Sequence, residues 1–393
     1  MALFALTIFL SAALLFLIQP MLAKQLLPYL GGGAAVWTAC LLFFQAMLLA
    51  GYAYAHALCR FLSPLAQRWL HSLLLLLGLL SLPLLYRSDA TAFSALPPLA
   101  AVLLFLLFTT GLPYFLLSAT GPLLQHWFAG RFSTVSPYRL YALSNIGSLG
   151  GLLAYPFLLE PGLLLSEQRL YWLSGFVVFA ACCLALMWQH LAALPPSYRA
   201  GAARLRQPAA FRWLLLSASG VVLLLAVTQQ LTQNVPPIPF LWVVPLAIYL
   251  LTFIVSFQST RWYQRSYALW VLGLISLIAV MMHFIGTQFN LLSQLCIYLG
   301  LLTVGCLICH AELAKAKPVS SQLTGFYLML ALGGCVGSAF VAFLATLLFD
   351  QFLEFPLAFV GLLLLLAWLL LSSPVASQGR TANAALSARI VQL

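Results

Sequence analysis

Charged residues are scarce in this sequence. Only 6% of its 393 residues are charged and 64% are hydrophobic, whereas a soluble domain carries about 25% charged and about 45–50% apolar residues. A water-soluble fold of this size exposes a large surface to water, and too few polar residues are present to cover it. The scarcity of charge excludes a soluble enzyme, a nucleic-acid-binding protein and a disordered chain. It indicates an all-α polytopic membrane protein.

Several common signatures are also missing. The eight cysteines lie in apolar stretches, so they do not form the disulfide framework of a small secreted protein. The first twenty residues lack the positive n-region of a signal peptide, and we expect a retained first span there. The sequence has no nucleophile–base signature, no HExxH and no phosphate-binding loop. We therefore assign no catalytic residue, no metal ligand and no cofactor.

Long apolar runs, interrupted by loops or charges, make up most of the chain. A membrane-crossing helix needs about 20 mostly apolar residues. On this criterion the sequence predicts twelve spans, at about residues 3–19, 35–58, 69–86, 98–118, 138–159, 170–193, 212–231, 240–257, 266–286, 291–313, 323–348 and 356–372.

The basic residues test this count, because Lys and Arg concentrate in cytoplasmic loops. With an even number of spans and both termini in the cytoplasm, 14 of the 17 Lys and Arg fall in inner segments. The outer segments then hold only Lys24, Arg87 and Arg169. We therefore expect a multi-pass protein whose N- and C-termini are both cytoplasmic.

The longest inner loop divides these spans six and six. It is a basic segment at 195–211, and it separates an N-terminal half (1–194) from a C-terminal half (212–372) that is followed by a short polar tail (373–393). Its arginines are sufficiently explained as ordinary topology signals near anionic lipid. No segment between spans is long enough for a folded soluble domain.

The two halves contain a repeat. The fifth and eleventh spans align without gaps, which pairs Tyr141, Gly147 and Gly151 with Tyr327, Gly333 and Gly337. Glycines at this small-xxx-small spacing let two helix backbones approach closely in lipid. Tight packing alone accounts for the glycines but not for their equivalent positions. The match indicates a parallel duplication of a six-helix unit.

One short motif suggests a metal or haem. Cys306, Cys309 and His310 form CxxCH, the string used for covalent haem attachment. Its position at the inner end of an apolar span argues against haem, and a metal site there lacks a fourth ligand. The remaining interpretation is a polar inner end, with His310 and Glu312 at the membrane face and Glu312 able to pair with Lys315 three residues later.

Polar groups within or near the spans are candidate functional residues, because lipid makes them costly. The structural alternative for each is a hydrogen bond at a helix end or between helices. As groups of a central cavity or an outer gate that bind substrate we select Gln19, Trp37, Asn145, Glu160, Gln229, Trp242 and His283. For the inner gate we select His310 and Glu312.

Prolines interrupt several predicted spans, at Pro113, at Pro122 and within 235–239. Broken backbone at membrane depth is tolerated where it lines a cavity or is buried in protein. This pattern favours a transporter over a plain membrane anchor, which needs only one uninterrupted helix.

Several stretches carry a family likeness, namely residues 18–56, 109–128, 136–161, 241–257 and 309–338. Together they resemble the membrane half of bacterial fused major-facilitator/spermidine-synthase proteins. The resemblance implies a major-facilitator-like helical domain in a bacterial inner membrane, often joined to a soluble aminopropyltransferase-like domain. This sequence ends soon after its twelfth span and lacks a Gly-rich nucleotide-binding domain, so synthase activity is not carried over. The loop after the second span also lacks the Gly-x-x-x-Asp-Arg-type signature of established major-facilitator transporters.

These observations leave two main hypotheses. The first is a transporter-like protein that handles a small solute, cationic or polyamine-like in character, through a central cavity. The alternative is a membrane-embedded partner or scaffold for a separate spermidine-synthase-like or redox subunit. The expected partners are the lipid bilayer, the solute and such a subunit, with no nucleic acid. A haem or metal protein that uses the CxxCH motif is a third option.

Overall fold

The computed structural model describes residues 1–30, 34–87, 93, 96–132, 135–190, 207–233, 239–285, 290–319, 322–341 and 354–372. Within these residues the regular structure is helical throughout. Nine of the described helices are long and apolar enough to cross a membrane. Three shorter apolar helices, Val243–Gln258, Leu323–Ala339 and Leu357–Trp368, bring the described apolar helices to twelve.

The first six spans form the N-half, which we define as α1 to α7. Their bounds are α1 (Ala2–Leu30), α2 (Ala34–Phe61), α3 (Pro64–Tyr86), α4 (Pro98–Arg131), α5 (Tyr138–Ala154) and α7 (Leu165–His190). The fifth span continues from α5 through a π-helical turn, η2 (Tyr155–Leu159), into the short α6 (Glu160–Gly162).

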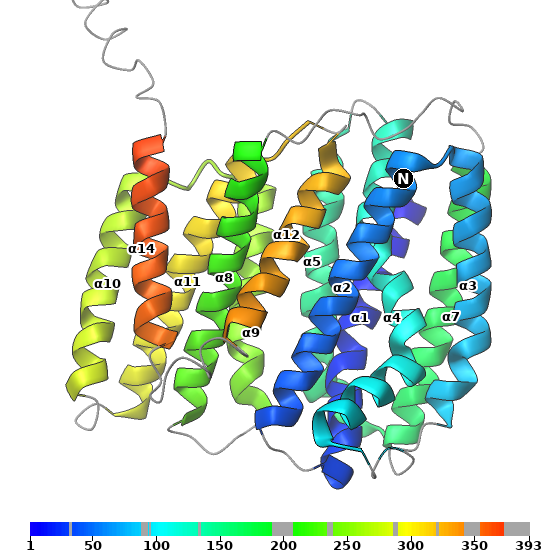
Figure 1. Cartoon of the computed structure of the whole chain (residues 1–393), viewed down its shortest axis with the longest axis horizontal. Coiled ribbons are helices and arrows are strands. Elements are labelled where there is room, and N and C mark those ends of the chain that lie inside the picture. Colours follow the sequence, from blue (N-terminus) through cyan, green and yellow to red (C-terminus); the bar gives the residue numbers. More distant parts are fainter. Residues whose placement is uncertain are drawn as a thin grey trace, which may run out of the picture.

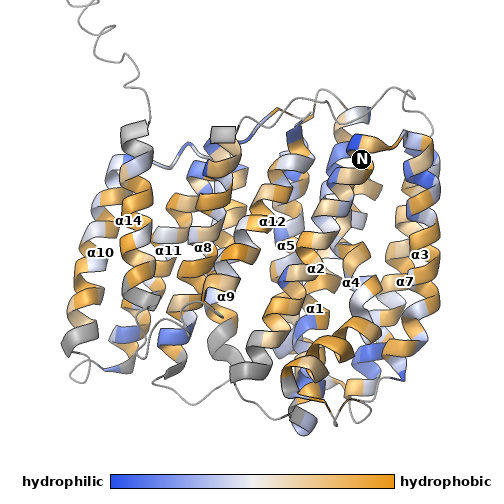
Figure 2. Ribbon diagram, viewed as in Figure 1, coloured by the Kyte–Doolittle hydropathy of each residue, from blue (hydrophilic) through white to orange (hydrophobic). Residues whose placement is uncertain are grey.

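The other six spans form the C-half, α8 to α14. Their bounds are α8 (Gln207–Gln233), α9 (Pro239–Gln258), α10 (Arg265–Ile285), α11 (Leu291–Lys315), α12 (Leu323–Ala339) and α14 (Glu354–Ser372). The helices of both halves stand side by side, and α14 ends at the same end of the bundle as the N-terminus (Figure 1). Apolar residues dominate the helix middles, and hydrophilic residues gather toward the helix ends (Figure 2).

The prediction of an all-helical membrane protein with twelve spans is confirmed, but the expected breaks at two prolines are wrong. Pro113 and Pro122 both lie inside the uninterrupted helix α4. Each proline removes a single backbone hydrogen bond, whereas leaving the helix would expose several backbone groups to an apolar environment. Continuing the helix therefore has the lower free-energy cost. Residues 235–238 lie outside the described part of the chain.

Two glycines of α5 bring its backbone directly against α1. A Cβ on Gly147 would lie 2.6 Å from the Phe9 carbonyl oxygen, and one on Gly151 would lie 2.5 Å from the carbonyl oxygen of Ala13. Real Cβ atoms do not approach an oxygen this closely, so both positions require glycine. The four-residue spacing of the glycines matches the four-residue spacing of their contacts on α1.

The C-half repeats this contact between α12 and α8. A Cβ on Gly333 would lie 2.5 Å from the Leu214 carbonyl oxygen, and one on Gly337 would lie 2.8 Å from that of Ala218. The glycines that align in sequence therefore play the same packing role on the equivalent helix pair. Residues of α1 correspond to residues of α8 at a constant offset, since Leu214 and Ala218 stand where Phe9 and Ala13 stand.

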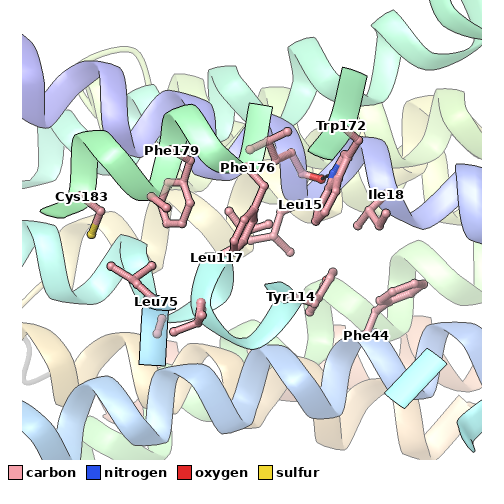
Figure 3. Packing of buried hydrophobic residues seen from close by; sticks show 14 of the residues in the cluster. Leu15, Ile18, Phe44, Leu75, Tyr114, Leu117, Trp172, Phe176, Phe179 and Cys183 are labelled. Atoms are coloured by element: carbon pink, nitrogen blue, oxygen red, sulfur yellow. Dashed lines mark hydrogen bonds between the residues drawn. The ribbon is translucent and has the colours of Figure 1, made fainter. Parts of the chain in front are cut away.

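Each half has a hydrophobic core. In the N-half, α7 turns Trp172, Phe176 and Phe179 toward residues of α1 and α4 (Figure 3). The Trp172 indole N–H donates to the Leu14 carbonyl at 2.8 Å, so this large ring is buried without an unpaired donor. A second core runs through the C-half helices and includes Trp213, Phe326 and Tyr327.

The two halves meet mainly along two helix pairs, with a smaller contact between α4 and α12. Helix α5 packs against α9, and α12 packs against α2. These two pairs are equivalent under the repeat, because α5 corresponds to α12 and α2 to α9. For orientation we call the end of the bundle where α11 finishes the Glu312 end, and the opposite end, where α6 lies, the Glu160 end.

Candidate functional site

Aromatic rings from both halves gather between the two helix pairs that join them. The centre of this group is a stacked pair, Tyr141 of α5 and Tyr327 of α12, with ring centroids 5.0 Å apart and planes inclined by 27°. Tyr52 of α2 contacts Tyr327, and Tyr249 of α9 packs on Phe253, whose ring contacts Tyr141. We call the four tyrosines the tyrosine cluster.

The cluster follows the internal repeat. Tyr141 and Tyr327 are equivalent residues of the two halves. Because they stack on each other, the pseudo-two-fold axis that relates the halves passes between them. Tyr141 also contacts the Phe257 ring of α9 at 4.7 Å, and Tyr327 contacts the Tyr52 ring of α2 at 6.5 Å. Each half thus contributes one tyrosine whose ring contacts an aromatic ring of the other half.

Amide groups surround these rings. The Tyr327 hydroxyl donates to Oε1 of Gln125 on α4, which ties α12 to the N-half. The Asn145 side-chain N–H donates to the Tyr141 carbonyl at 2.9 Å within α5. Tyr141, Tyr52 and Tyr249 are half-buried, whereas Tyr327 is buried.

Two further contacts join the halves toward the Glu312 end. Nδ1 of His56 on α2 and the Thr324 hydroxyl on α12 lie 3.0 Å apart in a hydrogen bond. The Tyr138 hydroxyl donates to the Pro318 carbonyl at 2.6 Å, with the Lys317 ammonium 5.0 Å from the Tyr138 ring centroid. The Tyr327–Gln125 bond and these two contacts all lie toward this end.

The predicted substrate-binding residues are spread along the bundle. Gly147 opposite Phe9 fixes the register of α5 against α1, and this register puts Asn145 level with Thr7. Gln19 follows Thr7 by twelve residues, which is about 18 Å along a helix. Gln19 donates instead to the Tyr114 hydroxyl at 3.1 Å inside the N-half. Gln19 and Asn145 are therefore not neighbours.

Glu160 already has a cationic partner in the N-half. Its carboxylate lies 2.8 Å from the Lys24 ammonium of α1, and both side chains are partly exposed. Gln229 is half-buried on α8. The side chains of the remaining predicted residues, Trp37, Trp242 and His283, lie outside the described part of the chain.

Glu312 lies in a charged centre of the C-half, at the Glu312 end of the bundle. Its side chain is only 1% exposed, and one carboxylate oxygen lies 2.8 Å from a guanidinium nitrogen of Arg212 on α8. Arg265 of α10 binds both carboxylate oxygens, and the Tyr263 hydroxyl donates at 3.0 Å. These contacts join three helices around one buried charge, and we call the four residues the Glu312 centre.

The expected pairing of Glu312 with Lys315 is wrong. The Lys315 ammonium instead lies 4.4 Å from the Tyr263 ring centroid, while the two arginines saturate the carboxylate. Burial raises the pKa of Tyr263, and the nearby Glu312 charge raises it further. The phenol therefore stays protonated and remains a donor to the carboxylate.

His310 is fully buried inside the C-half. Its Nδ1 lies 2.9 Å from the Thr252 hydroxyl, which itself donates to the Tyr249 carbonyl. Because a hydroxyl has one proton, the donor in the first bond is Nδ1–H. The imidazole stacks on Phe253 with centroids 3.5 Å apart, and Nε2 faces Gly220 of α8 without a hydrogen-bond partner. Its role in an inner gate stays a prediction.

The CxxCH motif does not assemble a metal site. Among the described residues, no group of three or more His, Cys, Asp or Glu side chains is placed to hold a metal ion. Cys306, Cys309 and His310 all face the Gly220 segment of α8, with the Cys306 thiol 3.8 Å from the Gly220 carbonyl. Both thiols are buried, and they serve here as small apolar packing groups.

A second repeat, between α4 and α11, was not predicted from the sequence. Residues 111–131 align without gaps with 295–315, and the alignment pairs Tyr114 with Tyr298, Gly121 with Gly305 and His126 with His310. Most of the aligned residues are leucines and only a few other residues match, so the sequence alignment alone is weak evidence for a repeat. The structure supports it, because α4 and α11 hold equivalent positions in the two halves.

No family model matches the sequence, and no curated protein matches it. Solved transporters match its structure. A bacterial homologue of the iron transporter ferroportin in an outward-facing state covers 93% of this chain and 96% of its own, with 15% identity and a TM-score of 0.58. A structure of a bacterial ferroportin homologue in an outward-facing state with soaked iron matches with 14% identity and a TM-score of 0.61, over 95% of this chain and 99% of its own.

A sugar transporter matches to a similar degree. The proton:xylose symporter XylE of the major facilitator superfamily, bound to 6-bromo-6-deoxy-D-glucose, covers 95% of both chains with 12% identity and a TM-score of 0.56. At such identities the likeness establishes the fold alone. The resemblance to the fused spermidine-synthase proteins stays a prediction, and the chain has the twelve-helix fold of major-facilitator transporters.

Proposed function

We propose that this protein is a transporter that carries a small organic solute between its two halves, with the tyrosine cluster as the principal contact. The observation that carries the proposal is the stacked pair of Tyr141 and Tyr327, equivalent residues that meet on the pseudo-two-fold relation. A solute bound there contacts both halves at once. Its binding is then coupled to any movement of one half against the other.

The solute class follows from the groups around the cluster. Tyrosine faces attract cations, and the side-chain oxygens of Gln125 and Asn145 are hydrogen-bond acceptors. The described carboxylates of Glu160 and Glu312 are already paired with basic side chains. We therefore propose an amine-bearing, polyamine-like solute that is recognised by rings and amides rather than by a free carboxylate.

The orientation in the membrane is part of the proposal. The N-terminus and the end of α14 lie at the same end of the bundle (Figure 1), which an even number of spans requires. Arg60, Arg131, Arg212 and Lys315 lie near this Glu312 end. The positive-inside rule then assigns it to the cytoplasm, in a bacterial inner membrane, with two six-helix domains joined by the segment 195–211.

The interface contacts support a closed cytoplasmic side. The bonds from His56 to Thr324 and from Tyr138 to Pro318 hold the halves together at the Glu312 end. In this state we propose that the solute reaches the half-buried rings of Tyr52, Tyr141 and Tyr249 from the Glu160 end. Breaking these contacts would open the opposite side.

Ligand-induced thermal stabilisation tests binding first. A ligand that binds only the folded state at 100 times its Kd adds about 2.7 kcal/mol, which raises the melting temperature. The panel should contain putrescine and spermidine, neutral amides, sugars and amino acids. We expect a shift with the amines, retained in Tyr171→Leu, a lipid-facing control, and lost in Tyr141→Leu.

Uptake into proteoliposomes then tests transport with the amine that gives the largest shift. Uptake above that of protein-free liposomes, lost in Tyr141→Leu, supports the proposal. Cooperative melting of the wild type without any shift or uptake across the panel contradicts it. Stoichiometric co-purification of a soluble subunit from native membranes would then favour the scaffold alternative.

A further inference from the structure

At the Glu312 end of the N-half, an arginine lies between two exposed tryptophans. The Arg68 guanidinium of α3 sits 4.4 Å from the ring centroid of Trp188 on α7 and 5.8 Å from that of its neighbour Trp69. The two indoles form an edge-to-face pair with centroids 5.3 Å apart. We call these three residues the Arg68 cluster, and they lie far from the interface between the halves.

The Arg68 cluster lacks a counterion within the described residues. No carboxylate there lies within ion-pair distance of Arg68, and its Nε has no hydrogen-bond partner although the atom is buried. A guanidinium that is fixed by packing and shielded from water on one side favours an anionic acceptor on the other. Arg60, a short distance along the chain, adds a second positive charge that has no carboxylate partner among the described residues.

At the opposite end of the α3–α7 pair, another arginine donates a hydrogen bond to a backbone carbonyl oxygen of the protein. Arg169 of α7 donates to the Tyr86 carbonyl at the end of α3, at 3.3 Å. Both arginines bridge α3 and α7, but only Arg169 finds a protein oxygen. The Nε of Arg169 is buried without a partner as well, so the two arginines differ in the acceptor of the terminal guanidinium nitrogen, and Arg169 is the reference for Arg68.

We propose that the Arg68 cluster binds the phosphate of an anionic glycerophospholipid. A guanidinium presents parallel N–H donors that fit two phosphate oxygens, and tryptophans at 58% and 47% exposure mark the headgroup level of a membrane. Below them α3 presents a continuous apolar face that includes Leu73, Leu76 and Leu80. Acyl chains can lie along this face while the headgroup meets Arg68.

A lipid explains these features better than a soluble phosphate does. The apolar face continues directly from the two indoles, so a ligand there is offered a hydrocarbon surface as well as a cation. A zwitterionic headgroup carries its own ammonium next to the phosphate, whereas phosphatidylglycerol leaves its phosphate charge for Arg68 and Arg60. This inference does not depend on whether the protein transports a solute.

Melting of the purified full-length protein tests the site. The detergent-solubilised protein receives phosphatidylglycerol, phosphatidylcholine of the same acyl chains, or inorganic phosphate. We expect phosphatidylglycerol alone to raise the melting temperature of the wild type and of Arg169→Gln. The shift should be lost in Arg68→Gln and reduced in Arg68→Lys, which keeps the charge but loses the planar fork.

A fluorescence measurement locates the lipid. Brominated phosphatidylglycerol should quench the tryptophan emission of the wild type more than that of Trp188→Phe, because bromine quenches indoles that it contacts. Equal stabilisation by phosphatidylcholine, an equal effect of inorganic phosphate, or an undiminished shift in Arg68→Gln would each overturn the proposal. If Arg68→Gln does not fold, Arg68→Lys and the quenching difference decide.

Discussion

The two halves share a backbone arrangement but differ in chemistry at the Glu312 end. In the alignment of α4 with α11, Phe128 stands where Glu312 stands. Phe128 packs edge-on against Phe4 of α1 with centroids 5.5 Å apart, and Phe132 closes the group at 4.9 Å from Phe128. The N-half thus seals this end with aromatic rings.

The C-half seals the same position with charges. Glu312 accepts from Arg212, Arg265 and Tyr263, and these partners come from the starts of α8 and α10 and the segment before α10. Arg212 occupies on α8 the position that Thr7 occupies on α1, given the register of the glycine contacts. The charged centre is therefore a feature of one half, added to a shared helix packing.

The two halves therefore share the same helix packing although their polar residues differ. The glycine contacts recur in both halves because they set how close two helices lie. The N-half has Phe128 and Thr7 at the positions of Glu312 and Arg212, so helix packing does not require the Glu312 centre. A buried ion cluster is weak support for stability but is strongly destabilising when one partner is removed. Substitutions at equivalent positions should therefore have unequal effects.

Removing the charge of Glu312 should have the largest effect. Glu312→Gln leaves two arginines facing an uncharged amide, and we expect a loss of about 3 kcal/mol in the free energy of unfolding. This is the lower end for a broken buried pair, because both arginine side chains are 29% exposed. Thermal or denaturant unfolding in detergent measures it.

The control is the equivalent position of the N-half. Phe128→Leu is a hydrophobic exchange in an aromatic cluster and should cost less than about 1.5 kcal/mol. Equal losses in Glu312→Gln and Phe128→Leu would contradict the idea that the C-half alone depends on charge at this end.

The glycine contacts should give the next largest effect, and an equal one in the two halves. In Gly147→Ala and in the equivalent Gly333→Ala the new methyl group meets a carbonyl oxygen at 2.6 and 2.5 Å, so the helices must separate. We expect each to cost about 1–3 kcal/mol, as for overpacking in a core. Unfolding measurements on the two variants compare the halves directly.

Gly150→Ala is the matched control, since nothing lies within 4 Å of its added Cβ. It should be neutral or stabilising, because alanine is the better helix former. A loss in Gly147→Ala but not in Gly333→Ala would show that the repeated sequence does not perform a repeated role.

The sequence revealed the packing of the fold more completely than it revealed the site. Apolar length and the basic residues predicted the twelve helices, and the spacing of Gly147 and Gly151 predicted a contact that the structure places on α1. Such features are local, because a run of apolar residues or a glycine pair carries its meaning within one helix.

The partners of Glu312 could not be found in this way. Lys315 is the near neighbour that helix periodicity offers, but the side chain points between helices, where Arg212 lies a hundred residues away in the chain. The tyrosine cluster was missed for the same reason: Tyr141 and Tyr327 were noticed as equivalent residues, and only the docking of the two halves brings them into contact.

The smallest predicted effects concern two His–Thr hydrogen bonds that lie in different parts of the protein. His56 and Thr324 form a hydrogen bond between the halves, whereas His310 and Thr252 form one inside the C-half. A typical hydrogen bond contributes about 1 kcal/mol, which is about a fivefold change in an equilibrium. Thr324→Val should therefore increase the opening of the Glu312 end about fivefold.

Hydrogen exchange separates local opening from global unfolding. Thr324→Val should speed amide exchange where α2 ends and α12 begins, with little change in the melting temperature. Thr252→Val strands the buried Nδ1 of His310, so it should lower the melting temperature and leave the exchange of those segments unchanged under native conditions. If both variants instead lower stability alike, the contact between the halves belongs to the folded core and cannot serve as a gate, because a gate must open at a smaller free energy than the protein unfolds.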